Sequence, residues 1–284
     1  METIRDFELI RDIDSAIRRL EMTRPLVFLD VETTGTNLES DRVVTLGLLR
    51  VEPDSDSDSD EVQIELMFKP PIKITPEATA VHGITDEMVA ECPSFKDSMG
   101  KINPFFEDDP ILVGHNIRRF DYPMLAAEFA IAGHSFGYDT IDTFLFFKAR
   151  FGHSLAAAYR LFAGRELAGA HGALADALAL PYVLAGLVSN TDLPADMDLL
   201  VHTPPDPDWI DGEGKFVWRN GEAVLTIGKK TAGRTLRQIA STDRGFLEWM
   251  LDKDFSSEVL DIVEKALRGE FPERKDTNLN AKEV

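Results

Sequence analysis

The sequence predicts an α/β domain built on a mixed sheet flanked by helices, followed by a small α+β domain. Strand-like stretches come first, and helical stretches then alternate with a further strand, an order typical of a mixed sheet. A Pro- and Asp-rich stretch separates this part from a shorter segment of different composition. With 284 residues, 44% of them hydrophobic, the chain is long enough for one full-size domain and a smaller second unit.

Four stretches have the pattern of strands. The run 26–31 is almost wholly apolar, the stretches 42–51 and 62–68 alternate, and 111–113 is a short apolar strand. The Asp-Ser repeat at 54–60 lies between two of them and lacks both the glycine and the spacing of a calcium loop. It therefore predicts a flexible hairpin loop.

Helical spacing of apolar residues appears in several other stretches. It predicts an amphipathic helix over residues 1–20, within an N-terminal segment of residues 1–24 that packs on the main domain. Further helices are expected over 94–106, 121–132 and 174–187, and Pro181 is expected to kink or break the last of these.

The rest of the expected domain organisation follows from composition. The α/β domain is expected over residues 25–190, and an acidic, Pro-rich linker or domain boundary without Lys or Arg over 191–212. The small domain is expected over 213–271, as a hairpin turning at Asn220 and Gly221 followed by three short helices. A polar tail is expected over 272–284.

The net charge of −20 argues against a nucleic-acid ligand unless the charge is unevenly distributed. It is uneven, because residues 215–237 contain six basic residues and a single acid, Glu222. We interpret this segment as a phosphate-binding surface formed by Lys229, Lys230 and Arg234, with Phe216 or Trp218 as a stacking ring. A solvated basic face on a small packing domain is an equally weighted alternative.

Membrane insertion, secretion and thiol chemistry are not expected. The chain has no uninterrupted run of about 18 apolar residues, and its first twenty residues are charged rather than signal-like. We therefore expect a cytoplasmic protein without a membrane partner. The single cysteine, Cys92, has neither a disulfide partner in the chain nor a zinc-ligand pattern around it.

Two acids end the first predicted strand. Asp30 and Glu32 project from one face, about 7 Å apart along the backbone, before residues 33–35 break the strand. At 4 Å, two like charges repel by about 4 kcal/mol at an effective dielectric near 20, so a cation is expected to balance them. An ordinary solvated strand end is the alternative for these two residues alone.

Three further residues extend this acidic site. Asp121 lies near the start of a predicted helix, where a helix-capping carboxylate is the local alternative. His171 and Asp176 are five residues apart, which places them about 140° apart on a helix. Both reach one centre only if His171 precedes the helix, and Gly172 favours this. A surface histidine is the alternative for His171 alone.

These residues carry a resemblance to a known family. The chain contains Asp-x-Glu-Thr-Thr-Gly from Asp30, His-Gly-Ile-Thr from His82, His-Asn-x-x-x-Phe-Asp from His115 and His-x-Ala-x-x-Asp from His171. In this order they resemble the DEDDh exonucleases over about residues 26–188, which implies a ribonuclease H-like fold. One departure is that three residues separate Asn116 from Phe120, where many members have two.

The resemblance implies a metal-dependent exonuclease that removes nucleoside 5′-monophosphates from 3′ ends. Its metal ligands would be Asp30, Glu32, Asp121 and Asp176, which would hold two divalent ions, Mg²⁺ or Mn²⁺. Oxygen ligands and the lack of a thiol cluster independently favour these metals over zinc. His171 would be the general base. The resemblance also implies substrate contacts: Thr33 would lie beside the terminal sugar, and His82 and Ile84 would flank the last nucleotide. Phe120 would stack or pack at the same place.

A second resemblance concerns the C-terminal part. Residues 226–267 resemble the small C-terminal region of exodeoxyribonuclease X-like proteins, which favours DNA over RNA. The expected partner is a 3′ end of DNA, in single-stranded form, although the sequence leaves the strand preference open. Three alternatives remain open: an RNA-directed exonuclease of the same superfamily, a catalytically silent nucleic-acid-binding adaptor, and a phosphodiesterase acting on small metabolites.

Overall fold

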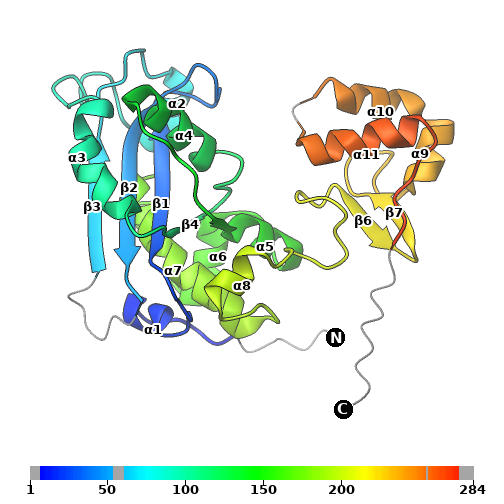
Figure 1. Cartoon of the computed structure of the whole chain (residues 1–284), viewed down its shortest axis with the longest axis horizontal. Helices are drawn as coiled ribbons and strands as arrows, with labels where there is room; N and C mark the ends of the chain where they lie inside the picture. Colours follow the sequence, from blue (N-terminus) through cyan, green and yellow to red (C-terminus); the bar gives the residue numbers. More distant parts are fainter. Residues whose placement is uncertain (1–6, 54–60, 254, 275–284) are drawn as a thin grey trace. The chain divides into compact units, whose positions relative to one another are not determined.

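The chain folds into two compact units, which divide between Thr203 and Pro204 (Figure 1). The computed structural model describes residues 7–53, 61–253 and 255–274. The expected hairpin loop at 54–60 and residues 275–284 of the expected tail lie outside this described part.

The first unit contains the predicted mixed sheet. Its strands are β1 (Leu26–Thr33), β2 (Val43–Val51), β3 (Glu61–Met67), β4 (Ile111–Gly114) and β5 (Thr140–Asp142). Their order is β3-β2-β1-β4-β5; β2 is antiparallel to both of its neighbours, β1 and β3, whereas β1, β4 and β5 are parallel. The α/β prediction is confirmed. Only β5 was not predicted, because a three-residue strand shows almost no periodicity.

Ten helices or turns of helix surround this sheet in the described part. They are α1 (Ile13–Ile17), α2 (Pro76–His82), η1 (Lys96–Ser98), α3 (Met99–Ile102), η2 (Asn103–Phe106), α4 (Asp121–Ala132), α5 (Thr143–Arg150), α6 (Leu155–Ala163), α7 (Ala173–Asn190) and α8 (Met197–Val201). The helices predicted at 121–132 and 174–187 are present, and Pro181 lies inside α7 without ending it. The predicted helix 94–106 is instead divided between α3 and two 3₁₀ turns.

Side-chain alternation along β1 divides the core into two layers. Leu26 and Phe28 pack with residues of α5, α6 and α7 on one face, whereas Val27, Leu29 and Val31 pack with α3 and α4 on the other (Figure 1). Because strand side chains alternate between faces, Asp30 and Glu32 continue the α7 face. The sheet therefore directs both acids towards α7.

The predicted N-terminal helix is wrong over most of its described length. Only Ile13–Ile17 is helical, because Asp12 caps this helix and its Oδ1 accepts a hydrogen bond from the Ser15 amide at 2.7 Å. Ile10 is fully buried before the helix begins, and its amide donates to the Phe162 carbonyl at 2.8 Å. The apolar spacing thus reflects a non-helical segment that packs on the core.

The segment 191–212, predicted as a linker or domain boundary, does contain the boundary between the two units, but it is not a free linker. Residues up to Thr203 belong to the first unit, where Met197 and Leu200 of α8 are fully buried. The later residues belong to the second unit, where Trp209 forms a bridge with Val217.

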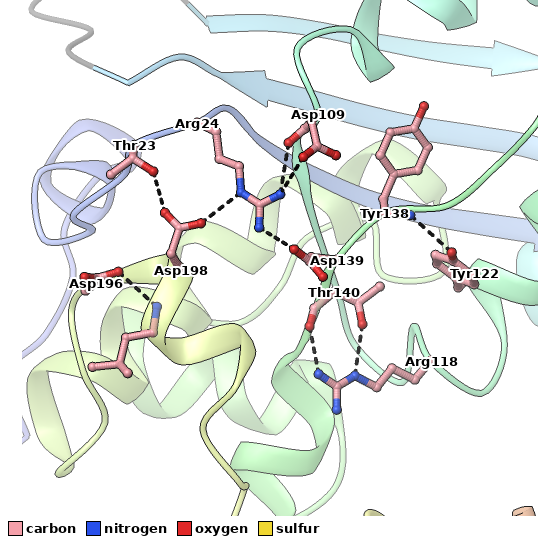
Figure 2. Close-up of polar contacts among 11 residues, drawn as sticks. Thr23, Arg24, Asp109, Arg118, Tyr122, Tyr138, Asp139, Thr140, Asp196 and Asp198 are labelled. Carbon is pink, nitrogen blue, oxygen red and sulfur yellow. Dashed lines mark hydrogen bonds and ion pairs between the residues drawn. The ribbon is translucent and has the colours of Figure 1, made fainter.

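Ion pairs explain why the acidic stretch around Asp198 packs closely against the rest of the first unit. Figure 2 shows Asp198 of α8 accepting hydrogen bonds from Thr23 and from Arg24, whose Nε lies 2.9 Å from the carboxylate. The same guanidinium pairs with Asp109 and Asp139, so one half-buried cation joins α8 to the residues that precede β4 and β5. Composition alone did not indicate that these acids have a partner.

Helix α7 is the centre of the first unit. In the described part of the chain, it is the one helix with the length and mean hydropathy of a membrane span, and 61% of it is buried within the protein. Its burial between β1, β2, α1 and α6 accounts for this apolar composition.

The second unit confirms the predicted small α+β domain. Strands β6 (Phe216–Arg219) and β7 (Glu222–Leu225) form a hairpin, followed by α9 (Leu236–Thr242), α10 (Arg244–Leu251) and α11 (Ser257–Leu267). The turn residues Asn220 and Gly221 have φ angles of 52° and 78°, as a two-residue type I′ turn requires. The core of this unit contains residues of the hairpin and of all three helices.

Candidate active site

Asp30 and Glu32 lie at the carboxyl end of β1, on the face covered by α7. Between Glu32 and Thr33 the pairing with β2 slips, so that Glu32 faces Thr45 whereas Thr33 faces Val43. Such a bulge bends the strand and ends its regular pairing. The two acids therefore lie next to the point where the regular pairing of β1 with β2 ends.

Asp176 completes a cluster of three carboxylates. It comes from the first turn of α7, and oxygens of Asp30, Glu32 and Asp176 lie within 4.8 Å of one another. The Oδ2 atom of Asp176 accepts a hydrogen bond from the His171 amide at 3.2 Å, whereas its buried Oδ1 atom has no hydrogen-bond partner in the described part of the chain. An unsatisfied buried acceptor is unfavourable, and a divalent cation is the group that three converging carboxylates suit.

Asp121 is held beside this cluster. It is the first residue of α4, and its Oδ1 accepts a hydrogen bond from the amide of Val31 at 3.1 Å. Val31 lies between Asp30 and Glu32, so this bond fixes the fourth carboxylate against the strand that carries the first two. The segment before it is fixed by Arg118, which bonds to Thr140 through Nε at 3.0 Å (Figure 2).

The four acids strongly perturb one another. Burial, together with the neighbouring carboxylates, raises the pKa of Asp30 well above its usual range and that of Glu32 to about 8. Burial raises the pKa of Asp121 to about 7, despite the hydrogen bond from Val31, and also raises the pKa of Asp176. Without a cation, the cluster therefore retains protons near neutral pH.

A fifth acid close by has a structural role. Asp142 ends β5 and is buried, and its carboxylate accepts hydrogen bonds from the amides of Asn116 and Phe144 at 2.8 and 3.1 Å. It is thus engaged by backbone amides, and its charge contributes to the raised pKa of Asp121.

His171 precedes α7 and is exposed. Its φ angle is +68°, and the helix begins only after Gly172, whose backbone is extended. This is the arrangement that allows a histidine and an acid five residues apart to face one centre.

A pocket of about 530 Å³ adjoins the cluster. Its lining includes Glu32, Thr33, His82 and Phe120, with further residues of the 35–41 loop and of α2. The structure therefore brings three of the four residues of the first unit that were predicted to contact substrate to one cavity. Ile84 does not line it, but packs with Val44, Ile74 and Val89.

The ring of His82 is oriented by two backbone groups. Its Nδ1 accepts from the Ile84 amide at 3.0 Å, so Nε2 carries the proton and donates to the Thr33 carbonyl at 3.2 Å. Burial lowers the pKa of His82, which favours this neutral form. The backbone amide of Ile84 thus helps to orient the His82 ring, which lines the pocket.

In the second unit, the residues expected to contact phosphate differ in their surroundings. Lys229 and Lys230 are exposed. Arg234 pairs with Asp243 at 2.7 Å and donates to Thr242, which gives it a structural role in joining β7 to α9 and α10. Phe216 is fully buried in the core, so its expected role as a stacking ring is wrong.

Two residues that were not predicted position α7. Asp30, Gly47 and Glu65 are register partners across β1, β2 and β3. A Cβ atom on Gly47 would lie 2.3 Å from the backbone of Ala173, so only glycine allows the helix to approach this closely. Glu65 accepts a hydrogen bond from the Leu174 amide at 3.2 Å and caps the helix in place of Gly172, which has no side chain. A glycine within an apolar strand was the available signal for such a close approach.

We expect Gly47→Ala to lower the affinity for Mn²⁺ by at least about tenfold, because the added methyl group displaces the first turn of α7 and with it Asp176. Isothermal titration calorimetry measures this. The control is Gly100→Ala, because a Cβ atom at Gly100 meets nothing within 4 Å. Equal affinities in the two variants would contradict this role of Gly47.

We also expect the metal-free protein to lose thermal stability as the pH rises from about 5 to about 8. Glu32 and Asp121 titrate at about 8 and about 7 in the folded state, above their ordinary values, so the folded state holds protons that the unfolded chain has released. Stability is then present below the ordinary pKa and is lost as the pH rises through the folded-state values.

Added Mg²⁺ should offset this loss, because metal ligands must be deprotonated. Thermal melts monitored by circular dichroism, with and without Mg²⁺, test the expectation. Glu32→Gln should flatten the metal-free pH dependence, whereas Glu39→Gln in an exposed loop should not. A metal-free stability that rises with pH over this range would refute it.

Comparison with known proteins agrees with this geometry. Residues 27–184, more than half of the chain, match the sequence model of the RNase T family of exonucleases. The DNA polymerase III subunit epsilon of Escherichia coli K12 is 26% identical over 234 residues, which cover 78% of this chain and 88% of that protein. A DNA polymerase III subunit epsilon-like protein of Rhodobacter capsulatus is 31% identical over 163 residues, 55% of this chain but only 23% of that protein.

The fold has a counterpart among solved structures. A structure of exonuclease I superposes with a TM-score of 0.52 at 20% identity, and the match covers 64% of this chain and 44% of that one. It supports the predicted ribonuclease H-like fold. The motif order, the family match and the fold together confirm the resemblance stated from sequence: the chain belongs to the RNase T family of DEDDh exonucleases.

Proposed function

We propose that this chain hydrolyses the terminal phosphodiester bond at 3′ ends of single-stranded DNA and releases nucleoside 5′-monophosphates. The observation that carries the proposal is the convergence of Asp30, Glu32 and Asp176 within 4.8 Å, beside a pocket of about 530 Å³. Its relatives named as DNA polymerase III epsilon subunits favour DNA over RNA.

The four carboxylates would hold two divalent ions, Mg²⁺ or Mn²⁺. Asp30, Glu32 and Asp176 offer converging oxygens, and the hydrogen bond from Val31 holds Asp121 beside them. Such ions, when bound, stabilise the attacking and the leaving oxygen at phosphorus. The protein contributes the rigid placement of the ligands through β1, α4 and α7.

His171 would take a proton from the attacking water. Its position outside the helix leaves the side chain exposed, while its backbone amide is tied to Asp176. Imidazole is the side chain most often used as a general base in enzymes, which suits this role. The exposed ring is free to exchange the proton with solvent after each turnover.

The pocket would receive the terminal nucleotide. Its volume is within the usual range of roughly 300–1,000 Å³ for small-ligand sites, which suits one nucleotide at a chain end. Phe120, Ala78 and Val81 offer apolar surface to the base and sugar, and Thr33 lies next to the ligand carboxylate of Glu32. A terminal residue enters such a cavity more readily than an internal one.

We expect His171→Asn to lower kcat by at least about a hundredfold and to leave the Mn²⁺ affinity largely unchanged, because the variant loses the base but keeps the four carboxylates. Single-turnover hydrolysis and calorimetric titration of Mn²⁺ measure the two effects. The control is His134→Asn, at another exposed histidine. Asp30→Asn should lose both activity and metal affinity. Near-normal turnover in the His171 variant would refute the assignment.

We expect 5′-labelled DNA to be shortened stepwise, with the label retained until late, and an oligomer with a 3′-phosphorothioate terminus to resist. The product should be nucleoside 5′-monophosphate, identified by mass spectrometry, and matched RNA should be degraded more slowly. Faster loss of RNA would favour an exoribonuclease. Binding without hydrolysis in Mg²⁺ and Mn²⁺ would indicate an adaptor, and hydrolysis of small phosphodiesters alone would indicate a metabolite phosphodiesterase.

A further inference from the structure

Helix α10 of the second unit has two different apolar sides. Leu247 and Met250 are fully buried in the core of the unit. Phe246 and Trp249 lie on another side, and Trp249 is 45% exposed despite its size. The Trp249 ring is 5.2 Å from that of Phe246 and 6.4 Å from that of Phe255. We call these three rings the aromatic platform.

Lysines lie next to this platform. The Lys253 ammonium is 5.5 Å from the centre of the Trp249 ring, and the Lys215 ammonium is 5.7 Å from that of Phe255. Within the described residues, Lys253 makes no ion pair, whereas Lys215 pairs with Glu213 at 3.4 Å. At least one cation beside the exposed tryptophan is thus available for a ligand.

The basic loop of Lys229 and Lys230 adjoins the same platform. It follows Gly228, where a Cβ atom would lie 2.9 Å from the Phe246 ring, so the loop packs directly on that ring. Both lysines are exposed and form no ion pair within the described part of the chain. Two exposed lysines thus directly follow the residue that packs on Phe246, and Lys253 lies beside Trp249.

We infer that the aromatic platform and its lysines bind single-stranded nucleic acid, with bases stacking on Trp249 and phosphates contacting Lys229, Lys230 and Lys253. Trp249 is the exposed ring, and Phe246 and Phe255 are partly buried beside it. An exposed ring next to cations matches the alternation of bases and phosphates in an unpaired strand. Paired bases cannot offer their faces in this way, so duplex is disfavoured. The inference rests on the proposed function for its ligand class, but uses none of the residues of the first unit.

The tryptophans of this chain allow a direct test. All three, Trp209, Trp218 and Trp249, lie in the second unit, so the tryptophan fluorescence of the intact protein, excited at a wavelength that tyrosine does not absorb, reports on that unit. The full chain is titrated in EDTA, which prevents metal-dependent hydrolysis, with a dT oligomer, an abasic oligomer of equal length and a blunt duplex. We expect quenching with the dT oligomer, and little with the other two.

Variants separate stacking from charge. Trp249→Ala should weaken dT binding, followed by anisotropy of a labelled oligomer, by about fivefold to a hundredfold and leave abasic binding unchanged. Leu251→Ala, at an exposed apolar residue of the same helix, is the matched control and should have no effect. Lys229→Ala with Lys230→Ala should weaken dT and abasic binding alike and flatten the salt dependence.

Unchanged dT affinity in Trp249→Ala, or tighter binding of duplex than of the dT oligomer, would overturn the inference. Because binding is measured without metal, its failure is distinct from failure of the proposed function. A chain that hydrolyses DNA but binds dT equally well without Trp249 refutes the aromatic platform alone. A chain that binds dT through Trp249 but hydrolyses no oligonucleotide refutes the proposed hydrolysis alone.

Discussion

The repulsion among four carboxylates at one end of β1 is the constraint on which this structure depends. Burial and mutual charge raise the pKa of Glu32 to about 8 and that of Asp121 to about 7, so the cluster is unfavourable when ionised and without a cation. Amides of Val31 and His171 offset part of this cost by hydrogen bonding to two of the acids. The rest of the fold holds the oxygens close together, where a divalent cation relieves the remaining repulsion.

The topology brings these acids together from distant parts of the chain. Strands β1 and β4 are parallel, so Glu32 near the carboxyl end of β1 and Asp121 beyond that of β4 lie at the same edge of the sheet. Asp176 arrives from the opposite direction on α7, whose close approach requires Gly47 and whose first turn is capped by Glu65. Each acid thus depends on a different contact, and the site requires all of them at once.

The sequence predicted what is encoded locally and missed what depends on distant partners. The strands around Asp30 and the helix at Asp121 have clear periodicity, and the ordered motifs identified the family. Spacings of three and four before Ile13 suggested a helix, but Asp12 caps a shorter one and Ile10 contacts Phe162 without a helix. The acids near Asp198 suggested a solvated linker, because the sequence does not show that Arg24 pairs with them. Likewise, only the strand register reveals that Gly47 lies beneath α7.

A chain with a net charge of −20 faces a general difficulty with a polyanionic substrate, and the proposed sites resolve it by different means. At the carboxylate cluster, bound divalent ions would invert the local charge, so that the acids attract phosphate through the metal. On the aromatic platform, stacking on Trp249 would supply affinity that does not depend on charge, and a few lysines would suffice for the backbone. Stacking is also less weakened by salt than phosphate contacts are. On this view the acidic surface repels nucleic acid elsewhere, so that binding is confined to the two places that can offset the repulsion.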